Sequence, residues 1–305
     1  MRVPTLALVL AAGLTAAGCS SPASPASPAA EQTPAAAGRS VQHARGTTTV
    51  PAEPRRVVVL EPLELDTAVA LGVTPVGAAV ASNVTGVPAY LGVGDAVEPV
   101  GTVPEPDLEA IAALAPDLIL GTESRHSQLY DALEGIAPTV FMATQSDPWQ
   151  QNVELVGEAL GRADRAAELL ADHRRHCEQV ADEHPGAGTA NLVRPRDGGT
   201  LSLYGPTSFA GSVLECAGLT LPARDWGGDI QVDISPERVP EAAADHLFVP
   251  VQDVEDPAGV PTLVAGNPAA FPAVHLVDTS YWISGVGPLG ARRVLDDVDR
   301  VLDAP

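Results

Sequence analysis

Residues 106–120 read Pro-Asp-Leu-Glu-Ala-Ile-Ala-Ala-Leu-Ala-Pro-Asp-Leu-Ile-Leu, and this stretch decides the fold that the sequence predicts. Its first part, residues 108–114, is typical of a short helix. Its second part, residues 117–120, is an apolar run of the kind that forms a strand buried on both faces. A helix followed by a buried strand is the repeating unit of α/β proteins, so we expect one such unit here.

The same alternation of β-rich runs and helical stretches surrounds this unit. Gly72 ends the first helix of the series, as glycine commonly does. The predicted strands are residues 57–60, 75–78 and 139–142, and the predicted helices are residues 64–71 and 128–134. Alternation of this kind builds a sheet that helices cover on both faces. We therefore expect a first α/β lobe over residues 47–146.

Residues 147–184 form the longest helical segment of the sequence. Asp147 is a good N-cap, and Pro148 suits the first helical position. Apolar residues continue from there with a four-three spacing that is interrupted only at Arg174. At about 1.5 Å per residue the helix would measure roughly 50 Å, which is longer than one lobe needs. The pattern predicts one uninterrupted, rigid helix that joins two lobes.

After Pro185 and Gly186 the alternation resumes, which predicts a second lobe over residues 185–305. Its expected strands are residues 191–193, 200–204, 246–251 and 274–277, and its expected helices are residues 208–216, 236–243 and 288–302. The predicted fold class is therefore α/β, with two sheet-and-helix lobes joined by one long rigid backbone helix.

The N-terminal residues have the order of a secretory signal. Arg2 supplies the positive charge, residues 6–14 are apolar, and Ala16-Ala17-Gly18 lead to Cys19. A cysteine at the cleavage point matches the lipobox of bacterial lipoproteins, although Ala16 stands where leucine is usual. The alternative is an ordinary cleaved signal with Cys19 as a simple thiol. We expect a signal peptide over residues 1–18 and a lipid anchor on Cys19.

Ser, Pro and Ala dominate the residues after Cys19, in repeated Ser-Pro-Ala units. This composition has almost nothing to bury, so residues 19–46 are predicted to be a disordered tether behind the lipidated cysteine. No other segment is long and apolar enough to cross a bilayer. The expected location is the outer face of the cytoplasmic membrane, with the lipid anchor as the only membrane contact.

The chain is strongly acidic, with 39 acidic residues against 17 basic ones and a formal charge of −22. Every basic residue is arginine, because the sequence contains no lysine. So acidic a surface argues against nucleic acid and anionic lipid as partners. It also makes each arginine informative, since arginine is the only fixed positive charge available to an anionic ligand.

Cys177 and Cys216 are the remaining cysteines. A secreted location permits a disulfide between them, but one pair is no disulfide framework, so the sequence leaves this pairing open. His173 and His176 lie three residues apart beside Cys177. Because Arg174 and Arg175 repel cations and no third ligand is near in sequence, we predict a solvated helix face here and no directly bound metal.

The succession of these segments resembles the helical-backbone (class III) periplasmic binding proteins, which serve ABC importers of ferric siderophores, haem and cobalamin. The most specific stretch is the opening one, together with Val100-Gly101-Thr102. The resemblance covers about residues 47–305. The other matching stretches are residues 56–60, 64–77, 204–218 and 233–237.

The resemblance implies a binding protein without catalytic residues or a cofactor of its own. It implies a ligand cleft between the two lobes, a monomer, and delivery of a ferric siderophore to the permease dimer of an ABC transporter. The alternatives are the same fold with haem, cobalamin or another metal chelate, and an adhesin that uses the same scaffold. An envelope hydrolase is the rival from another class, but no nucleophile-base pair can be named for it.

Arg125 is the first candidate ligand residue, because it follows the carboxyl end of a buried strand, where ligands of open α/β sheets bind. Its guanidinium can pair with carboxylate, catecholate or hydroxamate oxygens around ferric iron, and the alternative is a surface ion pair with Glu123. The resemblance adds four aromatic candidates and a weaker one, Tyr90. The four are Tyr204, Trp226, Tyr281 and Trp282.

Trp226 lies in a polar, glycine-rich loop, which favours contact with a bulky ligand, but it could instead cover the edge of the second lobe. Trp282 has the same alternatives, and Trp149 is expected to pack at the start of the long helix. The resemblance also implies that one acid on each lobe, Glu109 and Glu237, meets arginines of the permease. The alternative is that both are ordinary solvated acids.

Overall fold

The sheet of lobe one contains five parallel strands in the order β5-β4-β3-β6-β7. The structure is a computed structural model that describes residues 38–82, 86–145, 148–196 and 200–304. The described residues belong to one compact unit, residues 36–305. The strands are β3 (Val57–Val59), β4 (Gly77–Val80), β5 (Glu98–Thr102), β6 (Leu118–Thr122) and β7 (Thr139–Met142).

Helices connect these strands, as the alternating pattern predicts. The opening stretch forms α2 and β6, and Asp107 caps α2 because its Oδ1 accepts hydrogen bonds from the backbone of Glu109 and Ala110. All five residues of β6 are buried, in keeping with a central parallel strand. The helices of lobe one are α1 (Pro62–Ala70), α2 (Leu108–Ala113), α3 (Glu123–His126) and α4 (Tyr130–Glu134), with the 3-10 turns η1 (Ala89–Leu91), η2 (Gly94–Ala96) and η3 (Ser127–Leu129).

A hairpin of β1 (Arg39–His43) and β2 (Gly46–Val50) precedes the sheet, so the prediction of a tether up to residue 46 is wrong for its last part. Val41 and Val50 are buried in the alternating manner of half-buried strands. The hairpin joins β7, since the backbone N–H of Phe141 donates to His43 Nδ1 at 3.2 Å. The signal peptide, Cys19 and the rest of the predicted tether lie outside the described residues.

The segment predicted as one long helix is two helices, α5 (Trp149–Leu160) and α6 (Ala163–Glu183), so the prediction of an uninterrupted helix is wrong. Gly161 separates them with a left-handed backbone, φ +70°, which ends α5 in the conformation that favours glycine. Pro148 is the residue before the first turn, and the predicted cap Asp147 lies outside the described residues.

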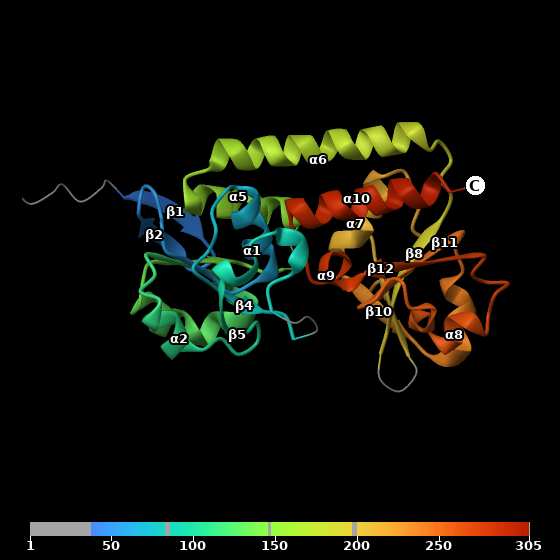
Figure 1. Ribbon diagram of the computed structural model, residues 1–305, viewed down its shortest axis with the longest axis horizontal. Coiled ribbons are helices and arrows are strands. Elements are labelled where there is room, and N and C mark those ends of the chain that lie inside the picture. The colour runs from blue at the N-terminus through green and yellow to red at the C-terminus, as the bar shows by residue number, and fades with distance from the viewer. Residues whose placement is uncertain (1–37, 83–85, 146–147, 197–199, 305) are drawn as a thin grey trace, which may run out of the picture. The chain divides into compact units, whose positions relative to one another are not determined.

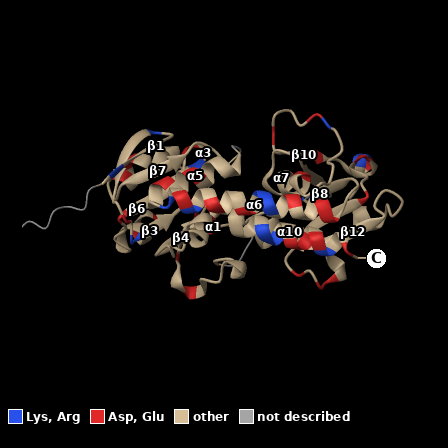
Figure 2. Cartoon of the chain, turned by 90° about the horizontal axis from the view of Figure 1, so that it is seen from above, with Lys and Arg blue, Asp and Glu red and all other residues tan. Residues whose placement is uncertain are grey.

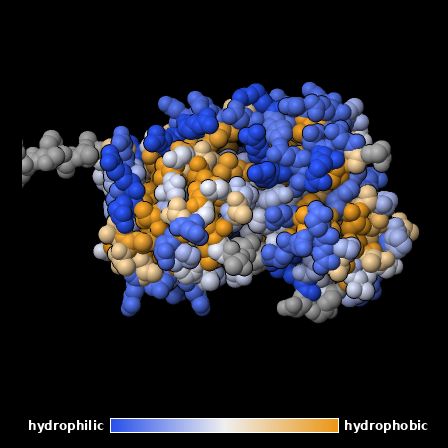
Figure 3. Space-filling view, viewed as in Figure 1, coloured by the Kyte–Doolittle hydropathy of each residue, from blue (hydrophilic) through white to orange (hydrophobic). Residues whose placement is uncertain are grey.

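The helix that spans the two lobes is α6. It packs against α5 on the side of lobe one and against α7 (Phe209–Cys216) and α10 (Pro288–Leu302) on the side of lobe two (Figure 1). Hydrophilic side chains cover its outer face (Figure 3), and arginines and acids follow one another along α6 and α10 (Figure 2). None of the described helices is long and apolar enough to cross a membrane.

Lobe two has a mixed sheet in the order β10-β9-β8-β11-β12, in which β8, β11 and β12 pair in parallel and β9 pairs antiparallel with both β8 and β10. The strands are β8 (Ala190–Pro195), β9 (Leu201–Tyr204), β10 (Gln231–Ile234), β11 (His246–Val251) and β12 (Ala273–Asp278). The other elements are α8 (Thr262–Ala265), α9 (Thr279–Trp282), η5 (Pro236–Ala242) and η6 (Pro257–Gly259). The helix predicted over residues 236–243 is thus the 3-10 segment η5, which contains Pro240.

Cys177 of α6 and Cys216 of α7 form a disulfide, which decides the question that the sequence leaves open. His173 lies beside it, with only 9% of its surface exposed and its ring edge-on to Trp149. The prediction of a solvated helix face is therefore wrong for His173, whose pKa burial lowers to about 4. His176 is partly exposed, and its Nε2 lies 3.7 Å from an Asp296 oxygen.

Asp66 of α1 connects lobe one to the start of α10. Its two carboxylate oxygens accept hydrogen bonds from the backbone of Leu289 at 2.9 Å and Gly290 at 2.8 Å, and Tyr90 donates its hydroxyl at 2.8 Å. The approach is so close that a Cβ at Gly287 would lie 2.4 Å from Asp66 Oδ1. Burial raises the pKa of Asp66 to about 6 against these hydrogen bonds.

Candidate functional site

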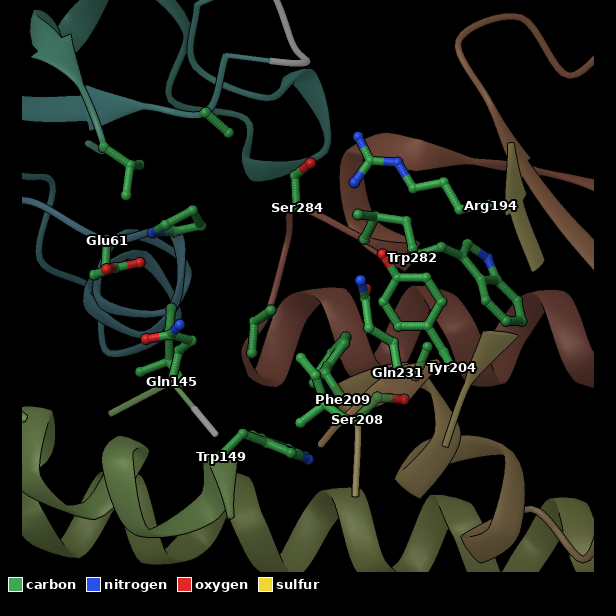
Figure 4. Close-up of a pocket in the computed structure, with 18 of the residues that line it drawn as sticks. Glu61, Gln145, Trp149, Arg194, Tyr204, Ser208, Phe209, Gln231, Trp282 and Ser284 are labelled. Carbon is green, nitrogen blue, oxygen red and sulfur yellow. The ribbon is translucent and has the colours of Figure 1, made fainter. Parts of the chain in front are cut away.

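A cavity of about 450 Å³ opens where the strand ends of lobe one face lobe two (Figure 4). Glu61 and Gln145 lie on the lobe-one side, and Arg194, Tyr204 and Gln231 lie on the lobe-two side. The volume falls in the range of sites for small molecules, about 300–1,000 Å³. The cavity is therefore the candidate site, and the walls differ in their charges.

The lobe-one wall carries an ion pair between Glu61 and Arg125, with Arg125 Nε 3.1 Å from Glu61 Oε1. The Glu61 side chain is 4% exposed, whereas Arg125 is 38% exposed. The alternative partner of Arg125, Glu123, instead pairs with Arg45 at 2.6 Å. Arg125 thus lies at the predicted place after β6 and reaches the cavity, but it is already paired with an acid.

Buried polar groups hold Arg125 in position. The neighbouring His126 is fully buried, and its Nδ1 accepts a hydrogen bond from the backbone of Thr122 at 3.1 Å. Its Nε2 therefore carries the proton and donates to the carbonyl of Val103 at 2.8 Å. These two bonds fix the turn from β6 into α3, from which Arg125 projects.

Glu61 stands at the N-terminus of α1, where it forms a capping box with Glu64. Glu64 is completely buried, and its Oε2 accepts hydrogen bonds from the backbone of Leu60 and Glu61, each at 3.1 Å. Burial raises the pKa of Glu61 to about 7, against the opposing effects of the Arg125 guanidinium and the Thr122 hydroxyl. Glu61 is therefore an acid whose charge is sensitive to its surroundings near neutral pH.

The lobe-two wall carries two arginines, Arg194 and Arg196, which project from the end of β8 and just beyond it. Arg196 is held by neutral groups, since its Nε donates to Ser202 Oγ at 2.7 Å and its Nη2 to Gln231 Oε1 at 3.2 Å. Arg194 is half-buried and makes no hydrogen bond or ion pair with any residue that the structure describes. This wall thus offers two arginines without an ion pair among the described residues, although Ser202 in turn donates a hydrogen bond to Asp233.

Aromatic rings line the cavity beside α5. Trp149 is buried, its ring lies edge-on to Phe209, and its Nε1 donates to Ser212 Oγ at 3.3 Å. Ser208 caps α7, because its Oγ accepts a hydrogen bond from the backbone of Gly211. Trp149 therefore packs at the start of the helix, as expected, and also lines the cavity.

The predicted aromatic residues are divided between the cavity and the core. Tyr204 and Trp282 line the cavity, although Trp282 is 1% exposed and stacks on Phe248. Asp297 of α10 accepts two hydrogen bonds at its Oδ2. The Tyr281 hydroxyl donates one and the Trp282 ring nitrogen Nε1 donates the other, each at 2.9 Å. Tyr281 is not among the described residues that line the cavity.

Trp226 also lies away from the cavity lining. It is partly buried and packs against the core of lobe two, where a Cβ on Gly205 would meet its ring at 2.7 Å. This is the expected alternative, in which the indole covers part of lobe two. The weaker candidate Tyr90 donates its hydroxyl to Asp66, where α1 contacts α10.

The two acids predicted to meet the permease are both exposed. Glu109 lies in the first turn of α2, and Glu237 in the first turn of η5. A hydrogen bond from Ser235 lowers the pKa of Glu237, so this side chain stays charged at neutral pH. One exposed acid thus begins a helical segment in each lobe.

Residues 57–274 match the family described as periplasmic binding protein. This range includes the cavity residues Glu61, Arg125 and Arg194. The chain belongs to the periplasmic binding protein family. The two-lobed fold with its cavity agrees with membership of a family of binding proteins.

Two curated relatives in Bacillus subtilis indicate where this periplasmic binding protein lies within the family. The probable siderophore-binding lipoprotein YfiY is 30% identical over 296 residues, which cover 86% of this chain and 86% of YfiY. The Fe(3+)-citrate-binding protein YfmC is 29% identical over 251 residues, which cover 81% of this chain and 78% of YfmC. Both alignments extend over most of each protein.

A solved structure supports the same placement. Staphylococcus aureus SirA in complex with staphyloferrin B superposes with a TM-score of 0.74 and is 27% identical. The match covers 87% of this chain and 98% of SirA. The helical-backbone, class III type that the sequence resembles is thereby confirmed.

Sequence reasoning missed Glu61, Arg194 and Arg196. Two signals could have found them. Arg194 and Arg196 are two residues apart at a strand end, so they point to the same face of the sheet. Glu61 and Glu64 have the three-residue spacing of a capping box before an apolar run, which places an acid at a helix N-terminus.

Proposed function

We propose that this periplasmic binding protein captures a ferric siderophore in the cavity between its lobes and delivers it to the permease of an ABC transporter. Iron arrives with the ligand, so the protein needs no cofactor of its own. The chemistry of the walls favours a chelate that presents anionic oxygens. Carboxylate-rich chelates, such as ferric citrate, fit this description best.

The observation that carries the proposal is the positive charge of the lobe-two wall. Arg194 is half-buried and lacks a partner among the described residues, while Arg196 is oriented by Ser202 and Gln231. Guanidinium groups bind carboxylate oxygens with two parallel hydrogen bonds, which gives both affinity and orientation. In a chain of formal charge −22, two arginines together in one cavity favour an anionic ligand.

The relatives support the same ligand class. YfiY is described as siderophore-binding, YfmC as Fe(3+)-citrate-binding, and SirA was solved with staphyloferrin B. Tyr204 and Trp282 add apolar surface on the lobe-two side, beside Trp149. Such rings suit the organic part of a chelate.

Anchoring and docking complete the proposal. Lipidation of Cys19 would keep the protein at the outer face of the cytoplasmic membrane, and YfiY is described as a lipoprotein. The exposed acids Glu109 and Glu237, one on each lobe, would meet arginines on the two subunits of the permease. The protein would act as a monomer and carry out no catalysis.

The test is quenching of tryptophan fluorescence by a panel of chelates. The panel contains ferric citrate, a ferric catecholate, a ferric hydroxamate, haemin and cobalamin, and iron-free citrate is the matched control. We expect ferric citrate to quench strongly and iron-free citrate to quench weakly, since Trp149 and Trp282 line the cavity. Saturable binding of haemin or cobalamin with no binding of any ferric siderophore would contradict the proposal.

A further inference from the structure

The Glu61 carboxylate depends on a single cation. The side chain is 4% exposed and lines the cavity, and Arg125 Nε lies 3.1 Å from Oε1, without the geometry of a well-oriented hydrogen bond. A buried carboxylate is costly unless it is paired, so its charge is sensitive to any change at Arg125. The cavity is the side from which a ligand can reach this pair.

Few charged or polar side chains surround Glu61. Arg125 on α3 holds Oε1 at 3.1 Å, Glu64 lies behind it on α1, and Thr122 ends the neighbouring strand β6. Arg194 and Arg196 face it from across the cavity. Arg125 is therefore the only cation among the described residues in direct contact with Glu61.

We propose that Glu61 is a specificity-determining residue that takes up a proton when a carboxylate chelate of iron engages Arg125, and then donates a hydrogen bond to an oxygen of that chelate. This inference rests on the proposed function and deepens it. The proton comes from the solvent and is bound at a Glu61 oxygen, and no other bond forms or breaks. A chelate that carries an ammonium group at this point would instead leave Glu61 ionised.

The physical reason for this proton uptake is that Glu61 and the ligand carboxylate compete for the Arg125 guanidinium. A ligand carboxylate at Arg125 draws that guanidinium toward itself and places a second negative charge beside the buried Glu61. Two carboxylates that share one site cannot both stay ionised cheaply, so the pKa of one of them rises. Because burial already raises the pKa of Glu61 to about 7, its protonation at neutral pH costs little.

The consequence is selection by charge. Protonated Glu61 becomes a hydrogen-bond donor, which satisfies an acceptor oxygen on the ligand and removes the repulsion. Carboxylate chelates should therefore bind more tightly below pH 7 than above it. The lobe-two arginines cannot produce this dependence, because guanidinium groups remain protonated throughout this range.

The test is isothermal titration calorimetry with ferric citrate at pH 7, in phosphate and in Tris, whose ionisation enthalpies differ. The protein variants are the parent, Glu61→Gln and, as a matched control, Glu154→Gln, an exposed acid on α5. Glutamine imitates the protonated acid, so Glu61→Gln should fold normally. Protons released or bound by the chelate itself are common to all three proteins and cancel in the comparison.

We expect the parent and Glu154→Gln to take up about half a proton more per ferric citrate than Glu61→Gln, since Glu61 is about half ionised near pH 7. The ratio of the dissociation constants at pH 8 and pH 6 should be about tenfold larger for the parent than for Glu61→Gln. Equal proton uptake and equal ratios in all three proteins would overturn the inference and leave the proposed function intact.

Two further outcomes separate the proposals. If the parent does not bind ferric citrate, the inference is overturned, whereas the proposed function fails only if no ferric siderophore of the panel binds. If Glu61→Gln binds ferric citrate with the pH dependence of the parent, the proton is bound elsewhere and the inference is again overturned.

Discussion

The two walls of the cavity treat charge in opposite ways. On lobe one, Arg125 is paired with the buried Glu61, so its charge is compensated before any ligand arrives. On lobe two, Arg196 is held by the neutral groups of Ser202 and Gln231, and Arg194 has no partner among the described residues. The difference teaches that lobe two supplies attraction for an anion and lobe one supplies discrimination.

The folds of the lobes explain this division. In lobe one, a parallel sheet places a helix N-terminus and a strand end side by side, which brings Glu61 next to Arg125. In lobe two, the antiparallel strands β8, β9 and β10 present side chains two residues apart to one face. The same arginine chemistry therefore acts in two electrostatic settings.

Removal of the uncompensated charge should have the largest effect. Arg194→Ala should weaken ferric citrate binding by about 3 kcal/mol, roughly a hundredfold, because hydrogen bonds to charged groups contribute up to that amount. Arg55→Ala is the control, since the Arg55 side chain is 82% exposed and outside the cavity lining. Equal affinities of Arg194→Ala and Arg55→Ala would remove Arg194 from the site. Fluorescence titration gives the affinities.

Removal of Arg125, whose charge is compensated by Glu61, should reduce the binding free energy less than removal of Arg194. Arg125→Ala should weaken ferric citrate by about 1.5 kcal/mol, roughly tenfold, because part of the guanidinium's interaction is already given to Glu61. Circular dichroism should not change, since Arg125 projects from a short helix into the cavity. A loss as large as that of Arg194→Ala would show that the Glu61 pair does not compensate Arg125 when ligand binds.

The compensated pair should also appear in the stability of the protein without ligand. The pKa of Glu61 is about 7 in the fold against an ordinary 4.5, so the folded state binds more protons between these values. The stabilising contribution is therefore complete at low pH and is lost as pH rises through about 7. Between pH 6 and pH 8 the parent should lose about 1 kcal/mol more than Glu61→Gln, measured by urea unfolding.

Four histidines have the opposite sign, because burial lowers the pKa of His43, His126, His173 and His275. Burial lowers the pKa of His173 and that of His275 to about 4, so their contribution is lost as pH falls from about 6.5 toward 4. These histidines are the same in the parent and in Glu61→Gln, and their effect on stability falls mostly below the range from pH 6 to pH 8. Identical slopes for the parent and Glu61→Gln between pH 6 and pH 8 would contradict the assignment of the buried acid.

The smallest effect on ligand binding is expected outside the cavity. The double change Glu109→Ala with Glu237→Ala should leave ferric citrate affinity unchanged, because both side chains are exposed and neither lines the cavity. It should instead reduce stimulation of the permease ATPase sharply, since exposed charge pairs set orientation and association rate more than affinity. Full stimulation by the double variant would make both glutamates ordinary surface acids.

The sequence predicted most of the fold because the buried strands leave continuous apolar runs, and β7, β11 and α10 have the predicted bounds. It did not predict the hairpin of β1 and β2, whose alternating pattern lies next to the Ser-Pro-Ala repeats. It also missed the break at Gly161, because the apolar spacing in the sequence continues through Ala163 and Ala167, although these two are exposed and the buried face of α6 begins at Ala166. A single glycine within a periodic pattern is a weak signal.

The site was less accessible to prediction. Arg125 could be placed from its position after a buried strand, but its pairing with Glu61 depends on a contact between residues far apart in the chain. Trp226 and Tyr281 were predicted as ligand residues, yet their surroundings depend on Gly205 and Asp297, which the local sequence does not reveal. Local patterns give the elements, and contacts between elements decide which face a side chain meets.

A crystal structure of the protein with ferric citrate tests the central claim most directly, namely that an anionic chelate binds between an uncompensated and a compensated wall. We expect chelate oxygens within hydrogen-bond distance of Arg194 and of Arg125, and one of them within the same distance of Glu61 Oε1. A chelate that binds elsewhere, or that contacts lobe one alone and leaves Arg194 without a ligand oxygen, would contradict the account.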